Sequence, residues 1–357
     1  MKILLIGEAS SLHLNLKKGL IECNHDVTLV SSGDGFKKIS SDIVLKRGKS
    51  KAGSLYYYYQ LASLIINFRN FDVVQLISTD FFPSKFRLDR MLIKILKQRN
   101  QKIFIVGAGC IDTYTCDFFQ NTYKYKEFYK AIKSHYKVDR LFGQTTKGRE
   151  FSKWLFNEIN GYIPIMYEYA EGHRNVSHDK LTATIPIPIK LEDFRYEKNT
   201  VEDKVIIFHG ISRREVKGTD FILKELNKLK DAFPDRVELL IVEKVSYSNY
   251  LKLLQKANIV VDQLYSVSTG VNGLISMALG KVTIGGGEKE FLKEFSLDKS
   301  PLIPIRKEVD NIFNILSELI HNKDEISRLG MESRTFIEKN HDAVKIAKKY
   351  INIWNEN

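Results

Sequence analysis

Residues 205–232 read VIIFHGISRREVKGTDFILKELNKLKDA, and this stretch decides the fold class. It opens with a run of apolar, β-branched and aromatic residues that predicts a buried strand. A polar turn with glycines at 210 and 218 follows, and from residue 219 apolar residues recur at the spacing of an amphipathic helix. A strand that runs directly into a helix is the repeating unit of wound parallel sheets, so the stretch predicts an α/β fold.

The same alternation of short apolar strands and amphipathic helices extends from this unit in both directions. In the first half, strands are predicted at residues 3–7, 26–30, 73–77, 102–107, 140–143 and 162–166, and helices at 12–23, 55–67, 87–98, 125–136 and 147–157. In the second half, strands are predicted at 205–209, 237–242, 259–264, 282–284 and 302–304, and helices at 219–232, 247–256, 271–279, 289–295, 309–320, 323–340 and 343–354. Ligands of such sheets bind beyond the carboxyl ends of the strands.

The length of 357 residues favours two domains over one. Residues 185–194, IPIPIKLEDF, carry two prolines and break the helical pattern, which is typical of a connection between domains. We therefore expect a Rossmann-like domain at 1–180, a second Rossmann-like domain at 181–340, and a terminal helix at 341–357 that packs back on the first domain.

Two absences bear on the cellular location. No apolar run approaches the roughly 20 residues of a membrane helix, and the opening MKILLIGEAS reads as a first strand and not as a signal peptide. The three cysteines form no CxxC pair, which argues against a disulfide framework or a structural zinc. The sequence predicts a cytoplasmic protein without a structural zinc site, and no cofactor is expected.

Nearly all of the net positive charge lies in one half of the chain. Residues 1–175 hold 27 Lys and Arg against 16 Asp and Glu, a net charge of +11, whereas the remainder holds 28 against 27, a net charge of +1. An asymmetry of this kind suggests that the first half faces an anionic membrane, a phosphorylated acceptor or a nucleic acid. A Lys-rich composition without functional meaning is the alternative.

The turn after the strand at 205–209 has the chemistry of an anion site. Arg214 and Lys217 lie three residues apart and can both point at one anion, while Gly218 allows close backbone approach. The helix that follows offers unpaired N–H groups. A basic turn capped by Thr219 is the alternative. Neighbouring residues of the same predicted site are His209, Gly210 and Arg213.

Two further loops have the same order of strand, glycines and helix. Gly270 and Gly273 flank Asn272 at the start of an apolar helix, and GGGEKEF at 285–291 follows the next strand. Helix N-termini of this kind suit the other face of a diphosphate, although glycines before a helix are also common in turns. The predicted donor-site residues of these loops are Gly270, Val271, Asn272, Gly273, Leu274, Glu288 and Glu290.

Taken together, these segments resemble the retaining, metal-independent GT-B glycosyltransferases of bacterial capsule and lipopolysaccharide assembly. The resemblance covers nearly the whole chain: the opening strand and helix, the passage IPIPIKLEDF, the basic motif RREVKG, and GVNGLISMALGKV at 270–282, which is similar to a family stretch ending in EAMACGKPV. It implies two Rossmann-like domains with a cleft between them, a nucleoside-diphosphate sugar as the donor of a hexosyl or related group, and a glycan or lipid-linked acceptor. It also implies that Arg214 and Lys217 bind the donor diphosphate and stabilise it as it leaves.

One departure from the family pattern affects the donor site. The family carries two glutamates eight positions apart, and the corresponding positions here are Val267 and Ile275, which cannot accept a hydrogen bond from a hydroxyl. Glu288 or Glu290 is expected to take over part of this task. Altered donor binding and a catalytically weak or silent chain are the alternatives.

The resemblance places the acceptor on the first domain. Asp112 follows the strand at 102–107 and is a candidate for orienting or deprotonating the acceptor hydroxyl, with a helix cap as the alternative. Glu8 and His13 are weaker candidates near the first strand. Residues 85–99 and 123–137 mix cations with large apolar residues, which suits the surface of an anionic bilayer as well as an ordinary amphipathic helix.

Two rival functions remain at this point. A catalytically silent nucleotide-sugar binder would explain Val267 and Ile275, and a basic α/β nucleic-acid-binding protein would explain the charge of the first half. The chain contains no recognition-helix or RNP-type pattern, so no nucleic-acid partner is expected.

Overall fold

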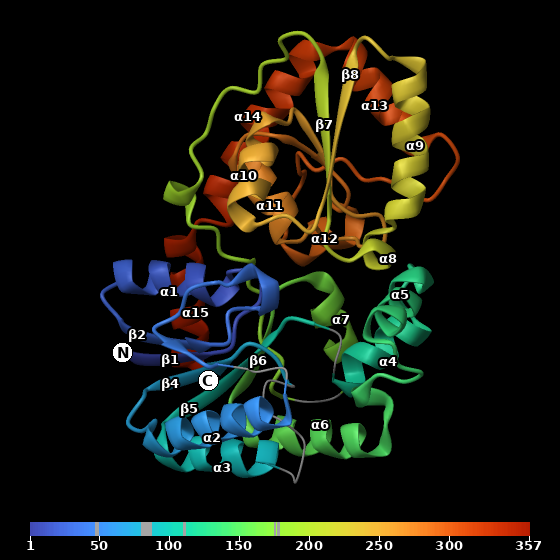
Figure 1. Ribbon diagram of the computed structural model, residues 1–357. Coiled ribbons are helices and arrows are strands. Elements are labelled where there is room, and N and C mark those ends of the chain that lie inside the picture. The colour runs from blue at the N-terminus through green and yellow to red at the C-terminus, as the bar shows by residue number, and fades with distance from the viewer. Residues whose placement is uncertain (47–49, 80–87, 110–111, 175, 177–178) are drawn as a thin grey trace. The chain divides into compact units, whose positions relative to one another are not determined.

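A computed structural model describes the chain except for residues 47–49, 80–87, 110–111, 175 and 177–178 (Figure 1). The chain divides into two compact units. Unit 1 comprises Met1–Thr122, Arg140–Lys190 and Ala343–Asn357, and unit 2 comprises Tyr123–Asp139 and Leu191–Asp342. The units differ from the domains expected from the sequence in two places. Residues 181–190 belong to unit 1, and the segment Tyr123–Asp139 belongs to unit 2 although unit 1 flanks it on both sides.

Unit 1 is built on a six-stranded parallel sheet with the order β3-β2-β1-β4-β5-β6. Its strands are β1 (Lys2–Ile6), β2 (Asp26–Ser31), β3 (Ile43–Val44), β4 (Val73–Leu76), β5 (Lys102–Gly107) and β6 (Gly161–Pro164). Its helices are α1 (Leu12–Glu22), α2 (Lys51–Asn67), α3 (Leu88–Arg99), α4 (Thr113–Asn121), α6 (Thr146–Glu158), α7 (Tyr167–Arg174) and α15 (Ala343–Glu356).

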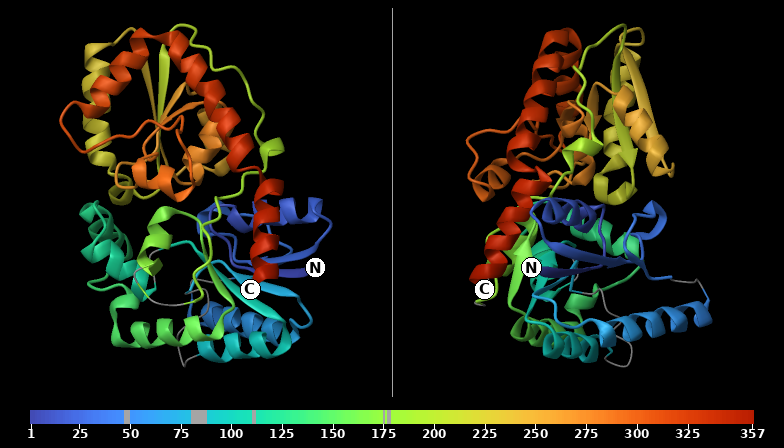
Figure 2. Two further views of the ribbon diagram at one scale, coloured as in Figure 1. Left: turned by 180° about the vertical axis from the view of Figure 1, so that it is seen from behind. Right: turned by 90° about the vertical axis from the view of Figure 1, so that its left-hand side faces the viewer.

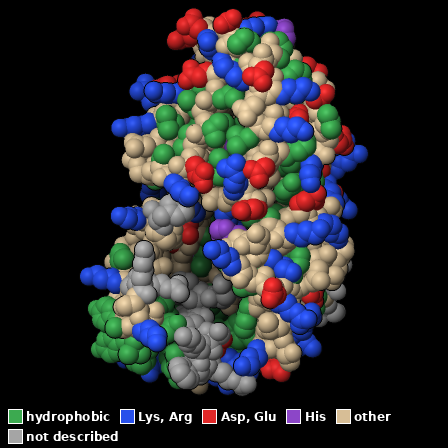
Figure 3. Space-filling view, turned by 45° about the vertical axis from the view of Figure 1, so that its right-hand side comes forward, with side chains coloured by type: hydrophobic (Ala, Val, Ile, Leu, Met, Phe, Trp, Pro, Cys, Tyr) green, Lys and Arg blue, Asp and Glu red, His purple; other side chains and the backbone are tan. Residues whose placement is uncertain are grey.

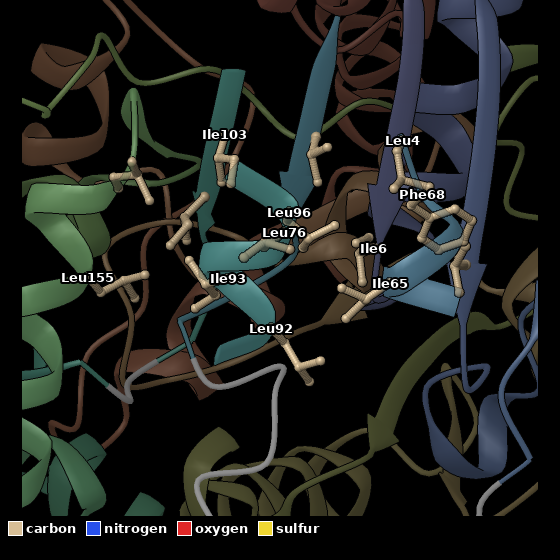
Figure 4. Close-up of a cluster of buried hydrophobic side chains, with 14 of the residues drawn as sticks. Leu4, Ile6, Ile65, Phe68, Leu76, Leu92, Ile93, Leu96, Ile103 and Leu155 are labelled. Carbon is tan, nitrogen blue, oxygen red and sulfur yellow. The ribbon is translucent and has the colours of Figure 1, made fainter. Parts of the chain in front are cut away.

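Unit 1 has two hydrophobic cores, one on each face of its sheet, because successive residues of a strand point to opposite faces. Leu4 and Ile6 of β1 pack with side chains of α2, α3 and α6 on one face of the sheet (Figure 4). Ile3 and Leu5 pack with α1 and α15 on the other face. Two helical layers therefore cover the sheet, which is why its strands read as continuous apolar runs.

The C-terminal helix α15 lies against α1 (Figures 1 and 2). Gly19 of α1 permits this contact, because a Cβ at Gly19 would stand 2.1 Å from the carbonyl oxygen of Ala343. Trp354 is buried in the same core, and its Nε1 donates a hydrogen bond to Gln75 Oε1 at 3.2 Å. The end of the chain is thus an integral part of unit 1.

Unit 2 contains a four-stranded parallel sheet with the order β10-β9-β7-β8. Its strands are β7 (Val205–Ile211), β8 (Val237–Glu243), β9 (Ile259–Val261) and β10 (Val282–Ile284). Its helices are α5 (Lys126–Tyr136), α8 (Arg214–Lys217), α9 (Thr219–Ala232), α10 (Tyr247–Lys256), α11 (Val271–Ala278), α12 (Lys289–Glu294), α13 (Asn311–His321) and α14 (Lys323–Asn340). The hydrophobic core joins these strands to α9 and α13, with Tyr125 and Phe128 packed against it.

Two segments that the sequence predicts as strands do not form strands. Residues 140–143 contain no strand, because Phe142–Gln144 form a 3-10 turn on which α6 begins. Gly148 fits closely over that turn, since a Cβ there would stand 1.9 Å from the carbonyl oxygen of Phe142. Residues 302–304 form only a single bridge between Ile303 and Ile284. Among the described residues, no helix is long and apolar enough to cross a bilayer.

We predict that Trp354→Ala destabilises unit 1 by about 3–5 kcal/mol, because it leaves a cavity in the core under α1 and removes the hydrogen bond to Gln75. Thermal or urea unfolding measures the change, with Lys349→Ala on the exposed side of α15 as the control. Equal melting temperatures for the Trp354 variant and the unmodified protein would contradict the packing assigned to α15.

Candidate functional site

The loops that follow β7, β9 and β10 meet at one edge of the unit 2 sheet. These strands are parallel neighbours, so their carboxyl ends lie side by side. β7 pairs with β8 on one side and with β9 on the other, which places a change in strand order at β7. Ligands of open α/β sheets bind at such a switch point.

Close packing of glycines holds the three loops against one another. Gly218 ends the first loop at a φ of +71°, and a Cβ there would stand 2.9 Å from the side chain of Leu264 in the second loop. Gly285 and Gly286 of the third loop also have positive φ, and a Cβ on either would meet backbone atoms of Gln263 or Ser268 at 2.5 and 2.7 Å. Glycine is required at these contacts because any side chain would force the loops apart.

A buried ion pair joins the first two loops. The Lys217 ammonium lies 2.9 Å from Asp262 Oδ1, and both side chains are almost inaccessible, at 7% and 2% exposure. Asp262 Oδ2 accepts a second hydrogen bond from the Thr269 hydroxyl at 3.1 Å. Gly273, in the first turn of α11, lies against this pair: a Cβ there would stand 3.2 Å from Asp262 Oδ2 and 2.0 Å from Thr269 Oγ1.

Within the described part of the chain, Asp262 is the one hydrogen-bond acceptor of the Lys217 ammonium. An ammonium has three N–H donors, so two are left for an oxygen-rich ligand. Burial strengthens such bonds, and Asp262 holds the cation in a single orientation.

His209 is neutral and makes two hydrogen bonds at the same edge of the unit 2 sheet. Its Nδ1 donates to the carbonyl oxygen of Val261 at 2.8 Å, which leaves Nε2 to accept from the Thr219 hydroxyl at 3.0 Å. Burial and the nearby Lys217 charge lower the pKa of His209 to about 4. His209 therefore ties β7 to β9 and to the start of α9 without adding charge at neutral pH.

Arg214 and Lys217 are directed at different carboxylates. The Arg214 Nε donates to Asp220 at 2.8 Å on the surface of unit 2, whereas Lys217 is buried against Asp262. Arg213 is exposed and Gly210 is buried within β7. The structure thus does not bring the two predicted cations onto one partner, and the diphosphate roles of Arg213 and Arg214 stay predictions.

Gly270 to Leu274 form the start of α11, as the sequence predicts. Gly270 precedes the helix in an extended conformation, Val271 and Asn272 are half-buried, and Leu274 is buried. Val267 and Ile275, at the positions where the family carries glutamates, are both buried. The donor-site roles of residues 270–274 stay predictions.

Glu288 and Glu290 are held by a segment from the first half of the chain. Lys124 Nζ lies 2.6 Å from Glu288 Oε2 and 2.7 Å from Glu290 Oε1, and the Tyr125 hydroxyl donates to Glu288 Oε1. The neighbouring Tyr123 hydroxyl accepts from the backbone N–H of Val267 at 3.2 Å. Residues 123–125 therefore tie the loops after β9 and β10 together, a connection that the sequence did not reveal.

In unit 1, Asp112 has the geometry of a helix cap. Its carboxylate accepts from the Thr115 N–H at 2.9 Å and from the Thr115 hydroxyl at 2.7 Å at the start of α4. His173 Nε2 lies 3.1 Å from Asp112 Oδ1, and both side chains are buried. Burial opposes ionisation, but His173 and the hydrogen bonds hold the pKa of Asp112 below its usual range. A catalytic role for Asp112 stays a prediction.

Glu8 and His13 lie at the start of α1. Glu8 accepts hydrogen bonds from the backbone N–H groups of Ala9 and Leu14 at 2.7 and 2.9 Å. His13 is fully buried, with Nδ1 donating to the carbonyl oxygen of Gly7 at 2.8 Å, and burial lowers its pKa to about 4. Both side chains support the first turn of unit 1, and their acceptor-binding roles stay predictions.

Sequence reasoning missed Asp262, Lys124, Tyr125 and His173. A carboxylate directly after a buried strand, beside a strand that ends in a basic loop, is a signal that could have marked Asp262. Lys124 and His173 carry no such local signal, because their partners lie 164 and 61 positions away in the chain.

We predict that Lys217→Met alone destabilises unit 2 by about 3–5 kcal/mol, since it leaves Asp262 buried and unpaired. Lys217→Met combined with Asp262→Asn should recover a large part of that loss, because no buried charge remains. Urea unfolding of the two single variants and the double variant measures the coupling. Additive losses would contradict the ion pair.

We also predict a pH dependence that originates at Glu8. Burial raises its pKa to about 7 from 4.5, so its protonated form favours folding. That contribution is fully present below pH 4.5 and is lost as pH rises through 7. The melting temperature of Glu8→Gln should accordingly fall less between pH 5 and 8 than that of the unmodified protein. Parallel curves would contradict the raised pKa.

Comparisons with known proteins support the fold. No family model matches the chain, and no curated protein matches it. Among solved structures, it is similar to HepE of Anabaena in complex with UDP and glucose, with a TM-score of 0.63 and 11% identity over 100% of both chains. It is also similar to the sucrose-phosphate synthase of Thermosynechococcus elongatus, with a TM-score of 0.64 and 13% identity over 100% of this chain and 99% of that one.

A further similar structure is the UDP-GlcNAc 2-epimerase of Neisseria meningitidis bound to UDP-GlcNAc, with a TM-score of 0.56 and 12% identity over 100% of both chains. At these identities the likeness concerns the fold. The chain has the α/β GT-B fold, as the sequence predicts.

Proposed function

We propose that the protein is a glycosyltransferase that transfers a sugar from a nucleoside-diphosphate sugar. The observation that carries the proposal is the buried Lys217 ammonium, held by Asp262 at the switch point of the unit 2 sheet with N–H donors left for a ligand. HepE, which is similar in fold, was solved with UDP-glucose, and the similar 2-epimerase was solved with UDP-GlcNAc.

The chemistry required of such a site is stabilisation of a departing diphosphate. Lys217 donates to a phosphate oxygen, and its orientation is set by Asp262 before the ligand arrives. Pre-oriented donors in a site with little water stabilise developing charge without reorganising. In this proposal the reaction needs no metal ion, and the C1 configuration of the transferred sugar is retained through an oxocarbenium-like transition state.

The wider role that we propose follows the resemblance described above. The transferred group is a hexosyl or related sugar, the acceptor is a glycan or lipid-linked, and the setting is capsule or lipopolysaccharide synthesis in the cytoplasm. The basic N-terminal half faces an anionic membrane, and no nucleic acid takes part. The excess of cations in residues 1–175 supports this arrangement.

A silent nucleotide-sugar binder is the second candidate. The observation that favours it is the burial of Val267 and Ile275, at the two positions where the family carries glutamates. Such a protein would bind the nucleotide sugar through Lys217 and release it unchanged.

We predict that UDP or another nucleoside diphosphate raises the melting temperature of the protein by a few degrees at saturating concentration, because it binds the folded state alone. Differential scanning fluorimetry with UDP, GDP and their sugars measures the shift. No shift with any of them would contradict the proposal.

The combined change Lys217→Met and Asp262→Asn should weaken nucleotide binding at least tenfold, since it removes the buried ammonium and leaves no unpaired buried charge. Lys224→Ala, which removes an exposed cation from α9, is the matched control and should leave binding within about twofold. Calorimetric titration gives both constants. Equal affinity for the double variant and the control would remove Lys217 from the site.

Product analysis then separates the candidates. Incubation with a nucleotide sugar and an acceptor lipid or glycan should release the nucleoside diphosphate in step with transfer. Binding without turnover supports the silent binder, and isomerisation of the nucleotide sugar without an acceptor would indicate chemistry like that of the similar 2-epimerase.

A further inference from the structure

Helix α2 (Lys51–Asn67) is apolar on both of its faces. Between residues 55 and 66, only Gln60 and Ser63 are neither aliphatic nor aromatic. Its inner face packs in the core of unit 1, where Tyr57, Leu61 and Ile65 are buried. Ile65 is labelled in Figure 4. A surface helix of a globular protein normally presents polar residues on the opposite face.

The outer face of α2 instead exposes large hydrophobic side chains. Leu55 and Tyr59 are 70% and 68% exposed, and Tyr56 and Ile66 are 53% and 48% exposed. Leu55, Tyr59 and Ile66 follow one another at intervals of four and seven residues, so they form a single stripe along the helix. Tyr56 and Tyr59 stack with their ring centroids 6.5 Å apart. Four large apolar side chains are thus gathered on one exposed helical face.

The chain around this face carries only positive charge. Residues 43–71 contain five cations and no Asp or Glu. Lys46, Lys51 and Arg69 are exposed at or beyond the two ends of α2. The neighbouring helix α3 adds the exposed Met91 and Lys94. Hydrophobic side chains also gather at the lower left of the face drawn in Figure 3.

We propose that the outer face of α2, with its flanking cations, docks on the surface of an anionic bilayer. Tyrosines place an apolar ring and a polar hydroxyl at the boundary between headgroups and acyl chains, and Leu and Ile enter the apolar side of that boundary. Lysines and arginines beside them attract acidic headgroups. A helix with an apolar outer stripe and basic ends has the composition of an interfacial helix.

Other occupants fit this surface less well. A second copy of the chain would bring the exposed cations Lys46, Lys51 and Arg69 near their own copies, which is electrostatically unfavourable. A nucleic acid would use the cations and the tyrosine rings but leave Leu55 and Ile66 without a role. The bilayer is the one partner that uses the apolar, aromatic and basic side chains together.

The docking element differs from the two segments that the sequence favours. Part of the segment 85–99 lies outside the described residues. The segment 123–137 lies in unit 2, and Lys124 pairs there with Glu288 and Glu290. The sequence does not predict this role for α2, because an exposed apolar stripe and a core stripe have the same spacing. Only the burial of each residue distinguishes them.

Flotation of the full chain with phosphatidylcholine vesicles, with and without 30% phosphatidylglycerol, tests the proposal. We expect binding to the anionic vesicles that weakens at 0.5 M salt, and at least a tenfold loss in the variant Leu55→Ser with Tyr59→Ser. Both residues are surface-exposed, so this variant should melt at the temperature of the unmodified protein. Val309→Ser with Tyr247→Ser, which removes exposed apolar groups from unit 2, is the control and should float unchanged.

Three outcomes would overturn the proposal. The first is binding that is indifferent to lipid charge, or equally strong in the α2 variant. The second is absence of vesicle binding together with a concentration-dependent dimer that the α2 variant abolishes, which would make this face an interface between copies. The third is binding of single-stranded RNA in place of vesicles. No nucleotide is present in these assays, so their result is independent of the donor site.

Discussion

The contact between Lys217 and Asp262 is the constraint on which the candidate site depends. Placing two opposite charges in the interior is expensive, and a pair of apolar side chains of similar size would stabilise unit 2 as well or better. We therefore infer that the role of the pair is to orient the Lys217 ammonium. It fixes an ammonium at the carboxyl ends of β7 and β9, and Asp262 in turn is held by Thr269. Glycines at 218, 273, 285 and 286 allow three loops to close around it.

Residues 123–125 hold two of these loops, those after β9 and β10, together. Tyr123 reaches the loop after β9, and Lys124 and Tyr125 reach Glu288 in the loop after β10. Both oxygens of Glu288 are thus engaged, each by one donor. A carboxylate has about four acceptor positions, so this engagement orients Glu288 without exhausting its capacity for a hydroxyl.

Most strands and helices could be predicted from the sequence because each forms from local periodicity. The strand predicted at residues 140–143 is wrong because two apolar side chains, Leu141 and Phe142, are too short a run to distinguish a strand from a turn. The basic loop at 213–217 was recognised from its composition, but the partners of its two cations were not. Arg214 and Lys217 separate because one lies on the exposed side of a single helical turn and the other on the buried side. Asp112 was ambiguous for a similar reason, since a cap and a catalytic carboxylate occupy the same place after a strand.

The division of the chain has a consequence for how the protein is made. Unit 1 consists of three separate pieces of sequence, and its last piece, Ala343–Asn357, is synthesised after residues 1–342. The core beside α1 therefore stays open throughout synthesis, with Ile3, Leu5 and Leu16 waiting for Tyr350 and Trp354. Unit 2 can bury its own core first, although its segment Tyr123–Asp139 is synthesised long before the rest. Unit 1 can therefore complete its core only after α15 has been synthesised, and a chaperone that shields its uncovered sheet would act during that interval.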